Sequence, residues 1–368
     1  MNKKILLACY EVPGWGGAST THYNLFERMQ TDGLDVAYVN LVNVKYENRF
    51  RKLFGHEVGN PRALDNVHNC VVEEPLWQPH SSLADVIEAE NPELILAFGC
   101  IAAHLVKLAA PHRTVVFMTS GSEEAKKLIV TGAFRDFQSF QQSDLRGLSF
   151  PIPSSSPEKQ AAQACELIIV HSPLIRTAFE IFYPHQIEKI YSNNISVADV
   201  VYAEADRFHY LKKPFERRDI EVVFAASDWS RPEKNYSMLR RIASRCAGRT
   251  IHVIGDCDAP TEHVIQHGVI AVREELYSLL GRSKILVCPS SFDAAPGVLF
   301  EASAMGCNVI ASRNCGNWDL CNDDLVANRY SALEFANKIN AALSKFHTDN
   351  RHRFCGGYLD LTETLCVF

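Results

Sequence analysis

The residues best suited to chemistry lie in one stretch of the second half, KILVCPSSFDAAPGVLFEASAMGCNVIAS (residues 284–312). Asp293 and Glu301 stand eight positions apart there, on either side of a predicted helix start at Pro296-Gly297. A helix N-terminus attracts a diphosphate, and a carboxylate one turn into the helix can accept hydrogen bonds from a ribose diol. The pattern therefore indicates a nucleotide site, although a single acid near a helix start is usually a surface residue favoured by the helix dipole. We expect Glu301 to be exposed at the helix start.

A second charged group follows an apolar run upstream, in VVFAASDWSRPEKNYSMLRRI (residues 222–242). Arg231 and Lys234 lie in the polar turn between a predicted strand and a predicted helix. An arginine fork and a lysine point charge both suit a diphosphate. A basic turn that is merely solvated is the competing interpretation.

Three glycines near the amino terminus, Gly14, Gly16 and Gly17, lie between an apolar run and a predicted helix, nearly as in a dinucleotide fingerprint. Ser19 stands where that fingerprint has its third glycine, and the second strand ends at Asn40 instead of an acid that could hold a ribose. A nicotinamide dehydrogenase is therefore a weak alternative. Backbone N–H groups at this helix start would suit phosphate or sugar oxygens, unless the loop is a tight turn without a ligand.

The elements that must position these groups are short apolar strands that alternate with helices along the chain. We predict strands at residues 4–10, 35–41, 93–99, 113–119, 166–172, 220–226, 250–256, 267–272, 284–290 and 308–312. These runs are apolar nearly throughout, which is typical of parallel strands buried on both faces. With helices such as 235–246 and 273–282 between them, the pattern predicts an α/β fold of two doubly wound domains.

The strand–helix alternation breaks once, over the polar and charged residues 193–219, which we interpret as the linker between the domains. Residues 46–90 and the Ser/Pro-rich residues 149–160 are predicted as loops or decorations of the first domain. The chain then divides into a first domain, a second domain and a tail that can pack back on the first domain: residues 1–203, 204–345 and 346–368.

The composition excludes several classes of protein. The 368 residues are 47% apolar and 22% charged with a net charge of -6, so global charge does not favour nucleic acid as a partner. No apolar run reaches the ~18 residues of a membrane span, and MNKKILLACY lacks a cleavage site, so we expect a cytoplasmic protein. The 12 cysteines are scattered, and we interpret them as buried reduced thiols instead of zinc ligands.

The second half resembles the carboxyl-terminal domain of retaining glycosyltransferases with the GT-B fold, of the large family-4 type (glycosyl transferases group 1). The family's donor signature is an acid, seven intervening positions and a glutamate; it stands here as Asp293 to Glu301, followed by AxAMGxxVIAS. The order of PEKN, HVIG, REELYSLL and CPSS is also similar, and GWGGASTTHYNLF looks like the family's amino-terminal Gly-Gly loop and helix. The resemblance is weakest at residues 42–92 and 120–165. It implies two Rossmann-like domains that face a cleft, the first for an acceptor and the second for a nucleotide-sugar donor.

The resemblance also implies roles for single residues. Glu301 would hold the ribose of the donor, Asp293 would contact the donor sugar, and Lys234 matches the family's phosphate lysine. The family commonly has an arginine five positions before that lysine, where this chain has Trp229. Arg231 would substitute for it from two positions later.

Backbone groups complete the implied donor site. The N–H groups of Gly297 and Val298 would bind the diphosphate, because Pro296 has no N–H to give. The backbone from Ile270 to Val272 would meet the base, and the loop of Gly16 and Gly17 would face the phosphates and sugar from the first domain.

One family feature is missing from its usual place. The family often has a histidine after the strand TVVFMT that contacts the donor sugar, and this chain has Thr119, Ser120 and Gly121 there. A hydroxyl of Thr119 or Ser120 replaces it, or another histidine does, either His104 or His171, or the activity differs. A single histidine such as His104 is more often a packed or surface residue.

The implied reaction is transfer of a sugar from a UDP- or GDP-linked donor to a glycan or lipid-linked hydroxyl, with retained configuration and without metal or cofactor. Arg231, Lys234 and the helix start at Gly297 would stabilise the departing diphosphate. A nucleotide-sugar 2-epimerase and a non-catalytic nucleotide-sugar-binding protein remain as alternatives. The basic and aromatic residues 45–56 fit either a peripheral membrane contact or an ordinary exposed segment.

Overall fold

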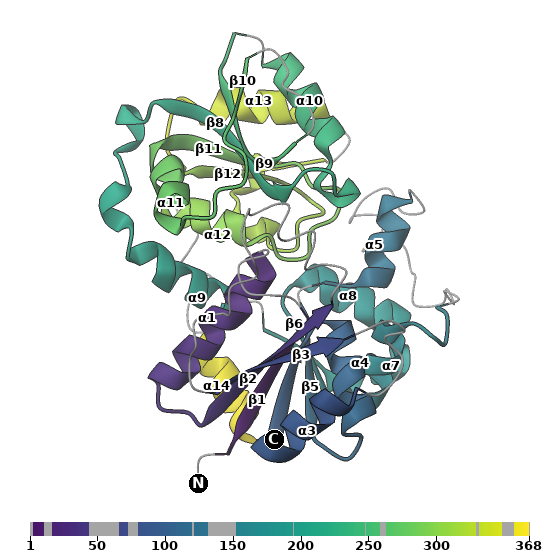
Figure 1. Cartoon of the computed structure of the whole chain (residues 1–368). Helices are drawn as coiled ribbons and strands as arrows, with labels where there is room; N and C mark the ends of the chain where they lie inside the picture. Colours follow the sequence, from purple (N-terminus) through teal and green to yellow (C-terminus); the bar gives the residue numbers. More distant parts are fainter. Residues whose placement is uncertain are drawn as a thin grey trace.

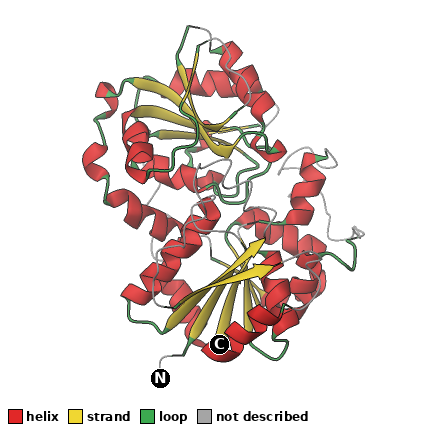
Figure 2. Ribbon diagram, in the orientation of Figure 1, coloured by secondary structure: helices red, strands yellow, loops and turns green. Residues whose placement is uncertain are grey.

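The computed structural model describes residues 3–10, 17–43, 66–72, 80–119, 121–131, 152–193, 195–246, 248–257, 263–328, 331–347 and 357–367. These residues form two α/β units, each built around one parallel sheet that helices cover (Figure 1 and Figure 2). The two doubly wound, Rossmann-like domains predicted from the sequence are therefore confirmed.

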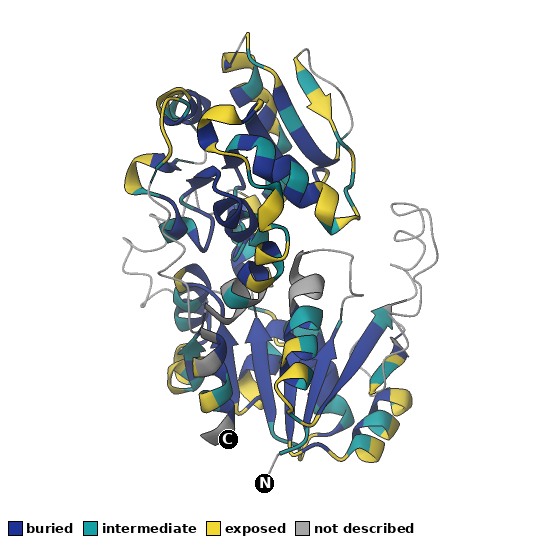
Figure 3. Cartoon of the chain, turned by 90° about the vertical axis from the view of Figure 1, so that its left-hand side faces the viewer, coloured by how far each residue is buried: buried dark blue, intermediate teal, exposed yellow. Residues whose placement is uncertain are grey.

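The first unit holds a seven-stranded sheet in the order β3-β2-β1-β4-β5-β6-β7. Its strands are β1 (Ile5–Cys9), β2 (Val36–Asn43), β3 (Val67–Val72), β4 (Leu94–Phe98), β5 (Val115–Thr119), β6 (Leu167–Val170) and β7 (Ile190–Ser192). Every residue of β1, β4, β5 and β6 is buried, as the dark blue strands of Figure 3 show. Burial on both faces explains why these runs are apolar at odd and even positions alike.

Helices cover both faces of this sheet: α1 (Gly17–Thr31), α3 (Ser81–Glu90), α4 (Cys100–Ala109), α5 (Glu123–Val130), α7 (Pro157–Ala164) and α8 (Pro173–Phe182), with the 3-10 turn η2 (Pro184–Lys189). Serine side chains fix three helix starts. Ser122, Ser156 and Ser172 each accept a hydrogen bond from a backbone N–H in the first turn, and a proline follows the last two. Serine and then proline is a favourable entry to a helix, so these starts are encoded locally.

The second unit holds a six-stranded sheet in the order β10-β9-β8-β11-β12-β13. Its strands are β8 (Ile220–Asp228), β9 (Ile251–Asp256), β10 (Val264–Gln266), β11 (Ser283–Cys288), β12 (Asn308–Ser312) and β13 (Val326–Ala327). Its helices are α10 (Tyr236–Arg245), α11 (Arg273–Arg282), α12 (Gly297–Ala304) and α13 (Ala332–Ala342), with the 3-10 turns η3 (His209–Leu211), η4 (Phe215–Arg217), η5 (Pro232–Lys234), η6 (Trp318–Leu320) and η7 (Asp323–Leu325). The strand order reverses at β1 and at β8, and open α/β sheets bind ligands at such switch points.

Two helices tie the units together. Helix α9 (Ile195–Asp206) connects the sheets, and its Tyr202 ring stands edge-on to Phe300 of the second unit with centroids 5.8 Å apart. Helix α14 (Gly357–Val367) returns to the first unit, where Leu361 is buried in an apolar cluster of that sheet.

One predicted strand does not form in the described residues. Residues 267–272 are not a strand, because β10 ends at Gln266 and only a single antiparallel bridge, between Gly268 and Gly255, follows. Gly268 has a φ of 64°, so the backbone turns away there from the extended conformation.

Regular structure also occupies segments that the sequence pattern left as loops or linker. Strand β3 and helix α3 lie within residues 46–90, and α7 begins within residues 149–160. Helix α9 spans much of the predicted linker, so the proposed division between residues 203 and 204 falls inside it. The segment 45–56 lies outside the described residues.

Candidate functional site

The carboxyl ends of the two sheets meet at the boundary between the units. The loop after β11 places Phe292 and Ala294 in an apolar cluster of the first unit. Gly316, which follows β12, packs so closely that a Cβ there would overlap the Ala294 carbonyl oxygen and lie 2.5 Å from the Ser172 hydroxyl of the first unit. Helix α12 faces α1 at the same boundary (Figure 1). Residues predicted at separate strand ends therefore share one region.

Lys234, the last residue of η5, forms an ion pair with Asp293 in the loop after β11. The two side chains are only 17% and 14% exposed. Backbone hydrogen bonds hold the turns together: Ser291 donates to the carbonyl oxygen of Glu233 at 2.8 Å, and Asp293 donates to that of Asn314 at 3.0 Å. The fold thus joins a cation and an acid that are 59 positions apart in the sequence.

The Asp293 carboxylate determines the charge state of this lysine. Burial by itself would lower the pKa of Lys234, but the neighbouring Asp293 outweighs burial and the pKa is raised. Lys234 is therefore an ammonium at neutral pH, neutralised by an internal partner.

Arg231 lies beside this pair but binds a different acid. Its Nε and Nη2 lie 2.8 Å and 2.5 Å from Glu233 Oε1, and Lys126 of α5 approaches the same oxygen at 3.3 Å from the first unit. Burial would raise the pKa of Glu233, but Arg231 and Lys126 contribute to lowering it. Glu233 is thus a buried anion that cations from both units share.

Glu301 is buried, not exposed at the helix start as the sequence pattern predicted; its residue exposure is 9%. Its Oε1 accepts from Arg273 Nη2 at 2.6 Å. Arg273 also binds Glu204 of α9, and the hydroxyl of Tyr277 lies 3.0 Å from Arg273 Nη2. In the sequence, the four-residue spacing of Arg273 and Tyr277, which puts both on one face of the predicted helix, is the only pattern that indicates this cluster. No pattern indicates Glu204, because it lies in the predicted linker.

The backbone groups predicted to bind the donor lie around the same edge. Gly297 opens α12, and a Cβ added to it would meet nothing within 4 Å, so space remains beside the first turn. The first N–H groups of a helix have no intrahelical partner, which leaves those of Gly297 and Val298 for a ligand. Ile270 packs partly against the second core, and Val272, just before α11, is 53% exposed.

The predicted sugar contacts of the first unit are differently placed. Thr119 ends β5, but its hydroxyl is engaged in its own turn with the carbonyl oxygen two residues on, at 2.5 Å. His104 is buried within α4, and burial lowers its pKa. Gly17 opens α1, whereas Gly16 and Ser120 lie outside the described residues.

Two histidines lie at the carboxyl edge of the first sheet. His171 follows β6, donates from Nδ1 to the carbonyl oxygen of Asn193 at 2.8 Å, and its buried Nε2 has no hydrogen-bond partner among the described residues. His22 of α1 stacks on Phe98 with centroids 4.0 Å apart. Burial, assisted by His171, lowers the pKa of His22 to about 3. Both rings are therefore neutral at pH 7, and His22 is a residue that the sequence pattern did not indicate.

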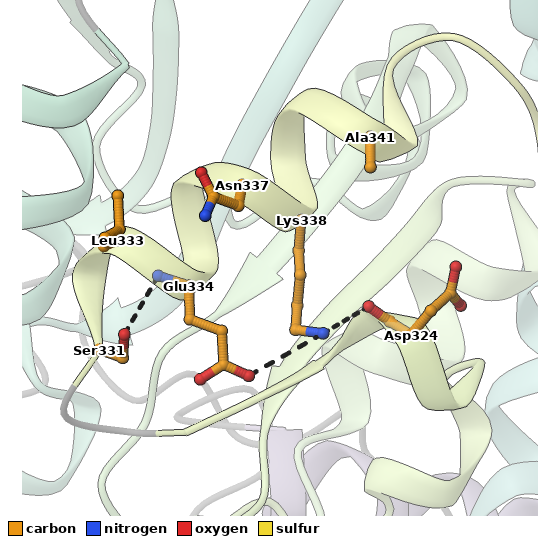
Figure 4. A pocket seen from close by; sticks show the side chains of 7 residues that line it. All are labelled: Asp324, Ser331, Leu333, Glu334, Asn337, Lys338 and Ala341. Atoms are coloured by element: carbon orange, nitrogen blue, oxygen red, sulfur yellow. Dashed lines mark hydrogen bonds and ion pairs between the residues drawn. The ribbon is translucent and has the colours of Figure 1, made fainter.

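Elsewhere, the described structure has a shallow cavity but no cluster suited to a metal ion. Within the described ranges, no group of three or more His, Cys, Asp and Glu residues is arranged to hold a metal ion. A shallow cavity of about 370 Å³ lies against α13 and η7, lined by Ser331, Glu334 and Lys338 among others (Figure 4). None of the residues predicted for the donor site lines it. No helix in the described segments has the length and apolar character needed to cross a membrane.

Comparison with known proteins agrees with this architecture. Residues 220–345 match the family model described as Glycosyl transferases group 1, and no curated protein sequence matches the chain. The fold is similar to that of Alr3699/HepE from Anabaena in complex with UDP and glucose, with 14% identity over 100% of both chains and a TM-score of 0.62. Sucrose-phosphate synthase from Thermosynechococcus elongatus has 15% identity over 99% of this chain and 98% of that chain, with a TM-score of 0.67. UDP-GlcNAc 2-epimerase from Methanocaldococcus jannaschii has 12% identity over 99% and 100%, with a TM-score of 0.58.

Identities this low establish only the fold, so the family assignment depends on the match of the second unit. That match covers β8 through α13, and so includes Lys234, Asp293 and Glu301. Residues 220–345 of this chain form a glycosyl transferases group 1 domain, and the whole chain has the GT-B fold.

Proposed function

We propose that the protein transfers a hexosyl group from a nucleotide-diphosphate sugar to a hydroxyl of a glycan or lipid-linked acceptor, with retained configuration and without a metal ion. The observation that carries this proposal is the half-buried ion pair of Lys234 and Asp293 at the carboxyl edge of the second sheet, where α12 also begins. A cation, helix N–H groups and a carboxylate are the groups that a departing sugar diphosphate requires.

Donor binding would exchange the partner of Lys234. Without donor, the ammonium is neutralised by Asp293. A diphosphate carries more negative charge than one carboxylate, so it would take over Lys234 together with the N–H groups of Gly297 and Val298. Asp293 would then be released to accept hydrogen bonds from hydroxyls of the donor sugar. Arg231, 45% exposed, would add positive charge from the solvent side.

The nucleoside would bind beside this diphosphate site. Glu301 lies one turn into α12 and would accept the ribose hydroxyls, while the backbone between Ile270 and Val272 would contact the base. A complex of HepE with UDP and glucose supports a uridine nucleotide as the first donor to test, with a guanosine nucleotide second.

The first unit would contribute neutral groups to the sugar. His171 Nδ1 is a donor to Asn193, so in the neutral ring Nε2 is an acceptor. Its lack of a protein partner suits a sugar hydroxyl that donates to it. His171 therefore replaces the histidine that the family often carries after β5. The acceptor hydroxyl would attack on the face that the diphosphate leaves.

An isomerase is the second candidate, because the fold is also similar to that of UDP-GlcNAc 2-epimerase. An epimerase acts on the nucleotide sugar alone and needs no acceptor. Incubation with donor alone, followed by analysis of the sugar product, separates the two: a changed hexose without an acceptor would favour the isomerase.

The proposal is tested with a panel of UDP, GDP, ADP and dTDP in thermal-shift and calorimetric titrations. A specific nucleotide at a hundredfold excess over its Kd should stabilise the fold by about 2.7 kcal/mol. Glu301→Ala should then lower turnover by roughly 10²-fold. Unchanged turnover in this variant would exclude the proposed ribose site, and activity that EDTA abolishes and Mn²⁺ restores would exclude metal independence.

A further inference from the structure

The protein provides a hydrogen-bond partner for one of the two carboxylate oxygens of Glu301. Its Oε1 accepts from Arg273 Nη2 at 2.6 Å, and no other hydrogen bond to this carboxylate is present among the described residues. A buried carboxylate with one oxygen fixed and the other uncommitted is oriented for a ligand. The orientation depends on Arg273, because the guanidinium is the group that fixes Oε1.

Arg273 is itself fixed from two sides. Its Nε lies 2.9 Å from Glu204 Oε1 and its Nη2 lies 2.5 Å from Glu204 Oε2, which is a bidentate fork. The Tyr277 hydroxyl, one turn further along α11, lies 3.0 Å from Arg273 Nη2 and 3.1 Å from Glu204 Oε2. One guanidinium thus separates two carboxylates, and without it Glu204 and Glu301 would repel each other.

Glu204 brings a third element into this network. It lies on α9, the helix that connects the two sheets, and its side chain is 15% exposed. On the same helix Tyr202 contacts Phe300, the residue before Glu301, and Asp199 accepts from the Tyr358 backbone N–H of α14 at 3.0 Å. Because α14 packs on the first sheet, α9 links the surroundings of Glu301 to both units.

We propose that Arg273, held by Glu204 and Tyr277, is a positioning residue that orients Glu301 toward the nucleotide ribose and couples nucleotide binding to α9. The inference rests on the proposed function, because it takes Glu301 as the ribose contact. It adds three residues that act through Glu301 and do not themselves touch the reacting atoms.

The test is a double-mutant cycle on nucleotide affinity, measured by calorimetry with the tightest binder among UDP, GDP, ADP and dTDP. Arg273→Gln should raise the Kd about tenfold or more, and Glu204→Gln about three- to tenfold. Arg273→Lys keeps a cation but loses the bidentate fork, so its Kd should lie between those of Arg273→Gln and the parent. In a Glu301→Gln background the change Arg273→Gln should alter the Kd by less than twofold, because its target is gone.

Arg282→Gln is the matched control. Arg282 is the last residue of the same helix and makes a bidentate pair with Asp219 at the surface, so its loss should leave the Kd within twofold of the parent. If Arg273→Gln does not fold, Arg273→Lys and Tyr277→Phe replace it in the double-mutant cycle with Glu301→Gln.

The outcomes separate the two levels of the proposal. If no nucleotide binds, or Glu301→Gln leaves the Kd unchanged, the donor site is wrong and this inference falls with it. If Glu301→Gln weakens binding but Arg273→Gln and Arg273→Lys do not, the inference alone is overturned. If Arg273→Gln raises the Kd by the same factor in the parent and in the Glu301→Gln variant, the inference is also overturned, since Arg273 then contributes to general stability and does not act through Glu301.

Discussion

The carboxyl edges of the two sheets meet in this protein, and they are built from opposite kinds of groups. The second edge carries buried and half-buried ion pairs: Lys234 with Asp293, Arg231 with Glu233, and Arg273 with Glu301. The first edge carries neutral groups, since burial keeps His22 and His171 uncharged and Thr119 is engaged in its own turn. Lys126 is a cation of the first unit that crosses to the second, at Glu233.

This difference indicates that the two units have different roles in the proposed reaction. Charges that are already paired in a partly dehydrated site need little reorganisation when a charged leaving group forms, which is the condition for strong electrostatic stabilisation. A neutral edge offers hydrogen bonds to hydroxyls without attracting a second anion. The charged edge therefore suits the diphosphate, and the neutral edge suits the sugar and its acceptor.

The largest effect is expected at the charged edge. Lys234→Ala removes the cation nearest to the proposed diphosphate and should lower kcat by roughly 10²-fold or more. Lys213→Ala is the control, because Lys213 pairs with Asp219 at the surface at 3.0 Å and should leave kcat unchanged. Parent-like turnover in Lys234→Ala would show that the charged edge does not serve the leaving group.

Asp293→Asn should separate the effect of the charged edge on nucleotide binding from its effect on turnover. Without its internal carboxylate, Lys234 is more available to a diphosphate, so the Kd of UDP or GDP should stay equal or decrease. Turnover should fall roughly 30- to 100-fold, the scale of a lost hydrogen bond to a charged group. Calorimetry and initial rates on one preparation measure both, and weaker nucleotide binding would contradict the proposed exchange of partners.

Much of the fold could be predicted from the sequence, because strands buried on both faces are short, nearly continuous apolar runs that alternate with helical stretches along the chain. The strands that escaped prediction, β3, β7, β10 and β13, are the edge strands of the two sheets and have two to six residues. A short strand with one partner is partly solvated, so VHNCVV over Val67–Val72 retains polar side chains and loses the apolar signal. Helix α9 was missed because it lies in a polar and charged stretch without a clear helical period, although Val201, Tyr202 and Ala205 pack on the second core.

The candidate site could likewise be predicted only in part. The motif around Asp293 and Glu301 specified which strand end to examine, and the fold brings Lys234 to it. The partners of these residues depend on how distant elements cross, and Arg273 meets Glu204 across 69 positions of sequence. No local pattern contains that contact, which is why the exposure of Glu301 was predicted wrongly.

The neutral edge predicts a pH effect of smaller size. The pKa of His22 is about 3 in the fold and about 6.5 in an unfolded chain. Between these values the unfolded state binds the extra proton, so the stabilisation is complete above pH ~6.5 and decreases as the pH falls toward 3. From pH 7 to pH 5 the loss is about 2 kcal/mol.

His22→Phe keeps an aromatic ring on Phe98 and removes this titration. The loss of unfolding free energy between pH 7 and pH 5, measured by urea titration, should therefore be ~2 kcal/mol smaller than in the parent. His185→Phe, at an exposed position of η2, should leave the loss unchanged. An equal loss in His22→Phe and the parent would mean that the neutral edge does not depend on this buried ring.

The smallest effect concerns the one ion pair found between the edges in the described structure. Lys126 is 31% exposed, and Glu233 still pairs with Arg231 when the lysine is removed. Lys126→Ala should therefore weaken transition-state stabilisation by only ~0.5–1 kcal/mol, which is a two- to fivefold decrease in kcat/KM. Lys127→Ala is the neighbouring control, because Lys127 is 64% exposed and pairs with Glu124 of its own helix. High salt should erase the difference between the two variants, since it screens half-exposed pairs. If Lys126→Ala and Lys127→Ala lower kcat/KM equally, the loss reflects the charge of α5 in general, and the ion pair of Lys126 with Glu233 does not help to hold the two edges together.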